Sequence, residues 1–200
     1  MNAIRRRVAA RLYAAGREHD RAQPDRLNRW RNVEPDTAEL IGVLIRAAGA
    51  RRILELGTSN GYSTIWLADA AEATGGRVVS VDVDPARIWL AGANLAEADL
   101  VDQVELRSED AAATLERSSD AEWEFVFLDA ERPAYAGYVP DLLRVLAPGG
   151  LLAVDNVRSH EPELAEFTAL VEAQESLTQT VVPVGAGLRV AVLDRPAGAR

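Results

Sequence analysis

The segment that decides the fold runs from Arg51 to Ser63 and reads RRILELGTSNGYS. Its first half is a short apolar run that stops at Gly57, which predicts a buried strand over residues 51–56. Its second half leads into a predicted helix over residues 61–73, which ends at Gly75-Gly76. Two glycines four residues apart, Gly57 and Gly61, let the backbone turn sharply and approach a ligand closely. The segment therefore predicts a strand, a tight loop and a helix whose first N–H groups are free.

The same alternation of strands and helices continues along the chain. Before this segment, helices are predicted over residues 2–20 and from Asp36 or Thr37 to Ala48; after it, over 85–98, 109–117, 134–146 and 161–175. Further strands are predicted over 77–82, 103–107, 124–129, 151–154, 178–183 and 187–194. Apolar strands between helices are typical of a parallel sheet covered on both faces, and the last two strands predict an antiparallel hairpin. The predicted fold class is α/β, a doubly wound, mostly parallel, seven-stranded Rossmann-like sheet with N-terminal helices and a C-terminal hairpin.

Acidic residues stand where a cofactor would bind in such a sheet, outside the carboxyl ends of the strands. Asp82 follows the second strand, where a carboxylate can accept both hydroxyls of a ribose. Glu55 precedes the glycine loop, where it would repel a pyrophosphate but could pair with an ammonium group. Together the loop and the acids indicate a cofactor with an adenosine and a cationic amino-acid group, and S-adenosylmethionine has both.

A second set of polar residues follows two later strands. Asp129 ends one strand and Asp155-Asn156 ends the next. If these strands are neighbours, their ends lie about 5 Å apart, so two carboxylates and an amide oxygen converge. Such hard oxygen donors suit Mg²⁺ or Mn²⁺ better than zinc. The pattern predicts a divalent-ion site that water and substrate must complete.

The composition is that of an ordinary globular protein of 200 residues, which predicts one domain with a small appendage. Neither a membrane span nor a secretory signal is recognisable, and cysteine is absent, so we expect a cytoplasmic protein that does not associate with membranes. All 22 basic residues are arginine, which excludes a lysine base. Residues 1–31 carry nine arginines and three acids, on a chain of net charge −9. We expect a helical arm or lid over 1–35, the main domain over 36–195 and a flexible tail over 196–200.

These motifs, in this order, resemble the cation-dependent, class I S-adenosylmethionine-dependent O-methyltransferases of the catechol and caffeoyl-CoA type. The resemblance runs from about Asn32 to Leu193 and is most specific in residues 55–63, 129–135 and 149–156. It implies S-adenosylmethionine, a divalent ion (Mg²⁺, or Mn²⁺ or Ca²⁺), a small hydroxylated acceptor and a homodimer. In it, Glu55 holds the methionine amino group, Ser63 the carboxylate and Asp82 the ribose. The other implied cofactor contacts are Val33, Gly57, Thr58, Asp110, Ala111 and Asp129, and the implied metal ligands are Asp129, Asp155 and Asn156.

One position departs from the family pattern. The family usually has a lysine three residues after the first metal aspartate, taken as the base for the acceptor hydroxyl, but this chain has Arg132. Because arginine stays protonated, it cannot accept that proton. We expect a metal at Asp129 to activate the hydroxyl and Arg132 to stabilise the developing anion, while the proton leaves to water or to Glu131. His160 is an alternative base, and Trp30 is a candidate lid over the acceptor.

Three alternatives stay open on the sequence alone. The arginine-rich arm fits an enzyme that methylates a hydroxylated uridine in tRNA, although the acidic body argues against extensive contact with nucleic acid. A nicotinamide-dependent oxidoreductase uses the same kind of sheet, but the middle glycine of its loop is missing here. The third alternative is a non-catalytic protein that binds S-adenosylmethionine.

Overall fold

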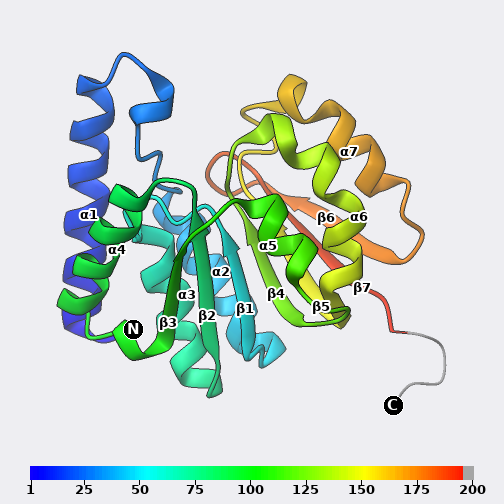
Figure 1. The fold of residues 1–200 in the computed structure, drawn as a ribbon, viewed down its shortest axis with the longest axis horizontal. Helices are drawn as coiled ribbons and strands as arrows, with labels where there is room; N and C mark the ends of the chain where they lie inside the picture. The colour runs from blue at the N-terminus through cyan, green and yellow to red at the C-terminus, as the bar shows by residue number, and fades with distance from the viewer. Residues whose placement is uncertain (196–200) are drawn as a thin grey trace.

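The computed structural model describes residues 1–195, which contain one seven-stranded sheet (Figure 1). The strand order is β3-β2-β1-β4-β5-β7-β6, with β5, β7 and β6 antiparallel and the other pairs parallel. The strands are β1 (Arg52–Leu56), β2 (Arg77–Asp82), β3 (Val104–Ser108), β4 (Trp123–Leu128), β5 (Leu146–Val154), β6 (Leu177–Val182) and β7 (Leu188–Leu193). The predicted fold class is confirmed.

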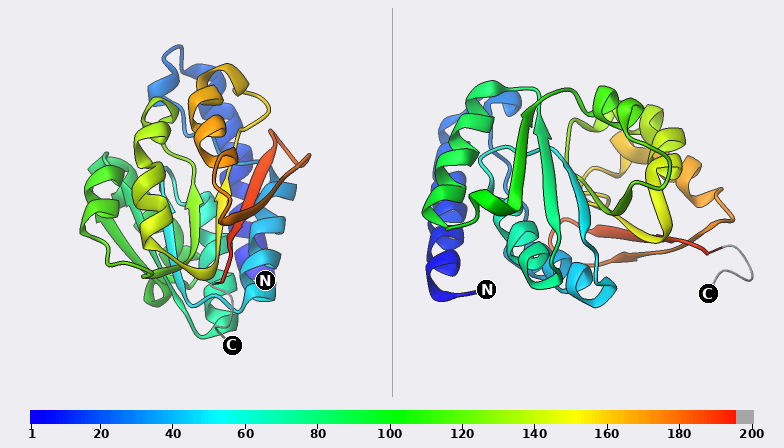
Figure 2. Two further views of the ribbon diagram at one scale, coloured as in Figure 1. Left: turned by 90° about the vertical axis from the view of Figure 1, so that its right-hand side faces the viewer. Right: turned by 60° about the horizontal axis from the view of Figure 1, so that its bottom comes forward.

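Seven α-helices within residues 1–195 cover the two faces of this sheet. They are α1 (Ala3–Ala22), α2 (Pro35–Ala48), α3 (Tyr62–Thr74), α4 (Pro85–Glu97), α5 (Ala111–Arg117), α6 (Tyr135–Val145) and α7 (Ala165–Glu172). Side chains alternate along each strand, so Phe125 and Phe127 join a core with α1 to α4, whereas Val126 and Leu128 join a core with α5 to α7. Figures 1 and 2 show these two layers of helices on opposite sides of the sheet. No helix of residues 1–195 is long and apolar enough to cross a membrane.

The N-terminal helix is tied to the body by a buried arginine. Arg5 is 6% exposed, and its Nη1 lies 2.9 Å from a carboxylate oxygen of Asp69 in α3. It also pairs with Glu72 and donates to the carbonyl of Ala98. Burial alone would raise the pKa of Asp69, but the guanidinium groups of Arg5 and Arg46 hold it below its usual value. The α1 helix is therefore anchored by charge as well as by apolar packing.

Two predicted boundaries are wrong. The strand predicted over 151–154 begins earlier, at Leu146, so residues 146–150 lie inside β5, beside a register shift between Trp123 and Phe125 of β4. The predicted helix over 161–175 is a 3₁₀ turn, η4 (Glu161–Leu164), followed by the shorter α7. His160, which precedes this turn, makes no side-chain capping hydrogen bond, so the start of a regular α-helix at Glu161 is not stabilised. The predicted tail over 196–200 lies outside the described residues.

The topology gathers four loops at one edge of the sheet. The strand order reverses between β1 and β4, and β2 and β5 flank that pair in parallel. The loops that follow these four strands therefore emerge on the same side, where ligands bind in open α/β sheets. The chain between α1 and α2 passes over this edge and contains the 3₁₀ turn η1 (Arg26–Asn28).

Candidate active site

A cavity of about 430 Å³ opens at this edge of the sheet. The arm, the loops after β1, β2 and β3, and the loops after β4 and β5 all line it. Of the predicted site residues, it brings together Val33, Gly57, Thr58, Ser63, Asp82, Asp110, Ala111, Asp129, Arg132, Asp155 and Asn156. Glu55 is the predicted site residue that does not line it.

The glycine loop is shaped by the neighbouring strand. Gly57 has a φ of +110°, and a Cβ atom at this position would lie 2.3 Å from the carbonyl oxygen of Asp129. The N–H groups of Gly57 and Thr58 both donate to the carbonyl of Val81, at 2.9 and 3.1 Å. The close approach that the sequence predicted is therefore made to protein backbone, and it fixes the loop relative to β2 and to Asp129.

Glu55 lies behind the cavity wall. Its side chain is fully buried and accepts hydrogen bonds from the hydroxyls of Ser63, Thr64 and Ser80 at 2.5, 2.5 and 2.6 Å. Burial raises the pKa of Glu55 to about 7, although these three hydroxyls oppose the shift. Ser63 lines the cavity, so the carboxyl group of Glu55 orients the hydroxyl that stands between it and a ligand.

The predicted adenosine side of the cavity contains two differently placed aspartates. Asp82 accepts the N–H groups of Ser59 and Asp84 at 2.9 and 3.0 Å, which fixes its carboxylate at the cavity wall. Asp110 uses its carboxylate to cap α5 through the N–H groups of Ala112 and Ala113. The Asp82 carboxylate is thus fixed at the cavity wall, whereas the Asp110 side chain mainly supports the start of a helix.

The predicted metal ligands meet at the ends of β4 and β5. The Asn156 side-chain amide donates to Oδ1 of Asp129 and to Oδ2 of Asp155, both at 3.1 Å. Asp155 is 3% exposed, and its Oδ1 atom is buried without a hydrogen-bond partner in residues 1–195. Burial raises the pKa of Asp155 to about 6, and burial together with the charge of Asp155 raises that of Asp129 well above its usual range. Two close carboxylates and an unpartnered oxygen atom are the features that a divalent cation would satisfy.

This group is small for a protein metal site. No set of three or more histidine, cysteine or acidic side chains in residues 1–195 is placed to hold an ion. The donor set is therefore two carboxylates, and the amide oxygen of Asn156 would join it once that side-chain amide turned over, because the amide nitrogen faces the carboxylates here. An ion with a preference for oxygen and for retained water, such as Mg²⁺, fits such a set better than zinc does.

Arg132 faces the same end of the cavity. Its side chain is 5% exposed, and its Nε atom donates to a carboxylate oxygen of Glu163 at 3.0 Å. His160 also lines the cavity, and burial together with the nearby Arg132 lowers its pKa. Tyr138 lines the cavity, whereas Tyr135 packs beneath it and donates to the carbonyl of Ala130. The residues expected near the acceptor hydroxyl thus lie at this end.

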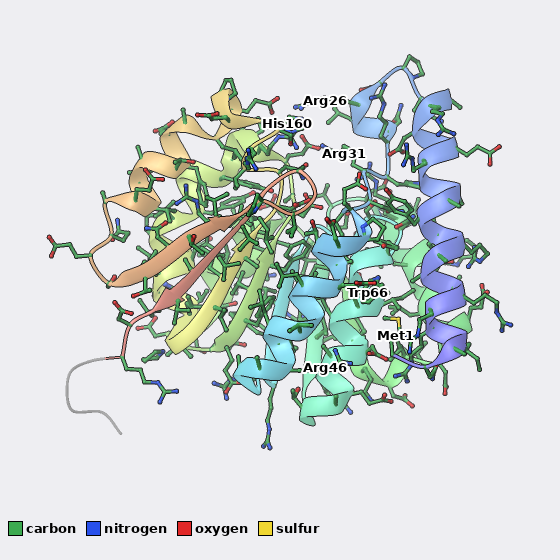
Figure 3. The ribbon with its side chains drawn as sticks, turned by 180° about the vertical axis from the view of Figure 1, so that it is seen from behind. Met1, Arg26, Arg31, Arg46, Trp66 and His160 are labelled. Atoms are coloured by element: carbon green, nitrogen blue, oxygen red, sulfur yellow. The ribbon has the colours of Figure 1, made fainter. Side chains whose placement is uncertain are left out.

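The arm covers the cavity through contacts that the sequence does not reveal. The carboxylate of Asp20 accepts the N–H groups of Trp30 and Arg31 at 2.7 and 2.9 Å, and Arg31 has a φ of +50°. The ring of Trp30 stacks on His19 with 4.0 Å between centroids. Arg31 pairs with Glu131, which places the arm against the loop after β4. Figure 3 shows Arg26, Arg31 and His160 close together at this end of the molecule.

Two further residues that line the cavity, Asn60 and Arg87, could not be identified as site residues from the sequence. Asn60 is fully buried, and its side-chain nitrogen has no hydrogen-bond partner in the described chain. Arg87 in α4 donates to the carbonyls of Leu27 and Arg29 and so holds the arm from the other side. Neither a single asparagine nor an arginine in a helix is distinctive in sequence. Trp89, a core candidate by its residue type, is instead 76% exposed on α4.

Comparison with known proteins agrees with this geometry. The profile of a family described as O-methyltransferase matches residues 18–191. Catechol O-methyltransferase of Niastella koreensis is 31% identical over 166 residues, which are 76% of this chain and 75% of that protein. The structure of an O-methyltransferase from Bacillus cereus in complex with SAH has a TM-score of 0.78 and 28% identity, covering 97% of this chain and 92% of that one.

A further solved structure combines similar identity with the same fold. It is the O-methyltransferase TomG from Streptomyces achromogenes, involved in tomaymycin synthesis and solved with SAM. It is 30% identical with a TM-score of 0.77, and the match covers 94% of this chain and 89% of that one. The expected resemblance is confirmed by the family profile and by these relatives. The chain belongs to the O-methyltransferase family of class I, S-adenosylmethionine-dependent enzymes.

Proposed function

We propose that this enzyme transfers the methyl group of S-adenosylmethionine to a hydroxyl of a small acceptor with vicinal oxygens, in the presence of a divalent ion. The observation that carries the proposal is the buried, unpartnered Oδ1 atom of Asp155 beside Asp129 and Asn156. An ion held by these three residues would lower the pKa of the acceptor hydroxyl and neutralise the two carboxylates. A catechol-like acceptor suits the site because two adjacent oxygens can chelate the ion.

The cofactor would lie along the wall between the glycine loop and Asp82. Ser63, Gly57 and Thr58 would face its methionine part, with Val33 of the arm above and Asp129 at its amino group. Asp82 would accept the ribose hydroxyls, and Ala111 would contact the adenine. The placement of these residues around one cavity and the ligands of the Bacillus cereus and Streptomyces achromogenes relatives support this arrangement.

The chemical step is a single displacement. The bond between the methyl carbon and sulfur breaks as the bond to the acceptor oxygen forms, the hydroxyl proton leaves to water, and sulfur becomes a neutral thioether. Because the sulfonium is a good leaving group, the protein mainly has to orient two reactants and exclude water. Trp30 and Arg31 of the arm exclude water from above. Arg132 would stabilise the negative charge that develops on the oxygen through the field of its own charge, without direct contact, and it cannot take the proton. His160, with its lowered pKa, is the side chain that can accept the proton in place of water.

Methyl-labelled S-adenosylmethionine and a panel of catechols, with Mg²⁺ or with EDTA, test this proposal. We expect transfer that requires the ion. Asp155→Asn should reduce transfer roughly 100-fold or more while binding of S-adenosylhomocysteine, measured by calorimetry, changes by less than about threefold, because Asp155 serves the acceptor end. Asp84→Asn is the control, since Asp84 is 47% exposed and outside the acceptor end. Undiminished transfer in EDTA would refute the metal role and leave the methyltransferase assignment intact.

The family relationship argues against two of the alternatives that the sequence leaves open, and it does not test the third. Membership in an enzyme family of O-methyltransferases sets aside the nicotinamide-dependent oxidoreductase and the non-catalytic binding protein. A tRNA acceptor stays a prediction, tested by the salt dependence of tRNA binding. A homodimer also stays a prediction, tested by light scattering of the purified chain.

A further inference from the structure

Five charged residues form a cluster above the acceptor end of the cavity, here called the rim cluster. Its members are Arg26, Arg31, Glu131, Arg132 and Glu163. Glu131 pairs with Arg31 and with Arg26, the latter at 3.5 Å, and Glu163 pairs with Arg26 at 3.4 Å and with Arg132 at 3.0 Å. Three guanidinium groups share two carboxylates, so the cluster has one positive charge in excess.

Arg132 is the least exposed guanidinium of this cluster, at 5% against 45% for Arg26 and 29% for Arg31. A guanidinium carries five N–H donors, and those that find no acceptor in the protein are left to water or to a ligand. Arg132 is 5% exposed, yet only its Nε atom has a hydrogen-bond acceptor in residues 1–195. Apart from Glu163, no acidic side chain of these residues lies within 4.0 Å of its nitrogens, Asp129 and Asp155 included. Because Arg132 lines the cavity and its two Nη groups are not among the buried atoms of the described chain that lack a partner, these groups face the cavity, where water or a ligand supplies their acceptors.

The other members of the cluster hold Arg132 in this orientation. Glu163 lies in η4, and Arg26 binds it from the arm, so the Nε contact is fixed from two sides. The side chains of Arg26 and Glu163 are 45% and 40% exposed, so water screens that pair strongly. The buried Arg132 is screened far less. A negative group of the substrate would therefore be stabilised more strongly beside Arg132 than beside Arg26.

We infer that the natural acceptor is a carboxylate, an anionic vicinal-oxygen compound whose carboxylate is bound by the two Nη groups of Arg132. This inference rests on the function proposed above and specifies its substrate class. A planar carboxylate matches the two parallel N–H donors of a guanidinium. It also supplies the single negative charge that balances the rim cluster when an ion neutralises Asp129 and Asp155. A neutral catechol would leave the Nη groups of Arg132 to water and would not balance its charge, so it is the poorer substrate.

The test is a competition between acceptors of different charge. Catechol, 3,4-dihydroxybenzoate and the methyl ester of that acid are mixed with the enzyme, Mg²⁺ and labelled S-adenosylmethionine, and the product ratios give relative kcat/KM. For the wild-type enzyme we expect the acid to be preferred over both neutral compounds by roughly 10–100-fold, the range of a charge-assisted pair. Arg132→Gln should bring the ratio to about 1, whatever it does to the overall rate, and Arg132→Lys should retain part of the preference.

A matched control separates contact from the general field of the protein. Arg21→Gln removes the same charge from the arm, but at an exposed position of α1 outside the rim cluster. It should leave the preference for the acid within about threefold of wild type, because exposed charges are strongly screened. An equal loss of preference in both variants would overturn the contact with Arg132. Equal use of acid and ester by the wild-type enzyme would overturn the inference as well.

A binding measurement distinguishes this inference from the proposed function. Calorimetric titration of 3,4-dihydroxybenzoate into the complex with S-adenosylhomocysteine and Mg²⁺ requires no methyl transfer. Tight binding that Arg132→Gln weakens at least tenfold, together with no transfer to any acceptor, would refute the proposed function and retain the anion site. Transfer to all three acceptors without preference would retain the proposed function and refute the anion site.

Discussion

The replacement of Glu55 by glutamine should stabilise the protein without ligand while weakening cofactor binding. Glu55 is fully buried, and burial raises its pKa from 4.5 to about 7. Between pH 4.5 and about pH 7, Glu55 therefore keeps its proton in the folded protein but has lost it in the unfolded chain. The stability that Glu55 contributes is therefore fully present below pH 4.5 and is lost as the pH rises through 7. At about 1.4 kcal/mol per pKa unit, the loss by pH 8 is about 3 kcal/mol.

Glutamine has nearly the same shape and does not ionise, so it avoids this loss. In the wild type the hydroxyls of Ser63, Thr64 and Ser80 donate to the carboxyl group, whereas the glutamine amide must itself donate to one of them. This rearrangement of hydrogen bonds costs about 1 kcal/mol of the stability that the variant gains. We expect Glu55→Gln to raise the free energy of unfolding by about 2 kcal/mol at pH 8 and to lower it slightly at pH 5. Urea unfolding followed by tryptophan fluorescence measures both values, since Trp123 is buried in the core.

The control is Glu39→Gln, which removes the same charge from an exposed position of α2 and should show no such difference between pH 5 and pH 8. Affinity for S-adenosylhomocysteine should fall in Glu55→Gln, because the glutamine amide would donate to Ser63 and turn the hydroxyl that lines the cavity. Equal destabilisation of Glu55→Gln at pH 5 and pH 8 would refute the reasoning, because it would mean that Glu55 is ionised in the fold at both values.

Three further substitutions test other parts of the structure. Gly57→Ala should destabilise the protein by more than about 3 kcal/mol in thermal unfolding, because the added methyl group would clash with a backbone carbonyl. Gly137→Ala, which has open space around it in α6, should stabilise the protein by up to about 1 kcal/mol. Equal effects of the two substitutions would contradict this account. Arg5→Met should lower the free energy of unfolding by about 3 kcal/mol, since it leaves a buried aspartate with fewer partners, and the exposed Arg6→Met should change it by less than about 0.5 kcal/mol. Asn60→Leu should weaken calorimetric binding of S-adenosylhomocysteine at least tenfold if the unpartnered amide faces that ligand, and unchanged affinity would exclude such a contact.

The sequence by itself determined the succession of strands and helices and the residues at the strand ends. Apolar runs, glycines and prolines act over a few residues, so the segment 51–63 and the later strands could be read locally. The positions of Asp82, Asp129 and Asp155 after their strands followed from the same patterns. Since parallel strands place their carboxyl ends on one edge, even the meeting of Asp129 and Asp155 was predictable once the strands were neighbours.

Only the tertiary structure decided which way these side chains point and what else reaches them. It places Glu55 behind three hydroxyls rather than in the cavity. It brings the carbonyl of Asp129 so close to Gly57 that no side chain fits there. It also brings Arg31 of the arm to Glu131, and Arg132 to Glu163, leaving two Nη groups of Arg132 open to the cavity. These contacts join residues that are up to 100 positions apart. No local pattern encodes them, because charge pairing and burial depend on distances that the packed chain alone sets.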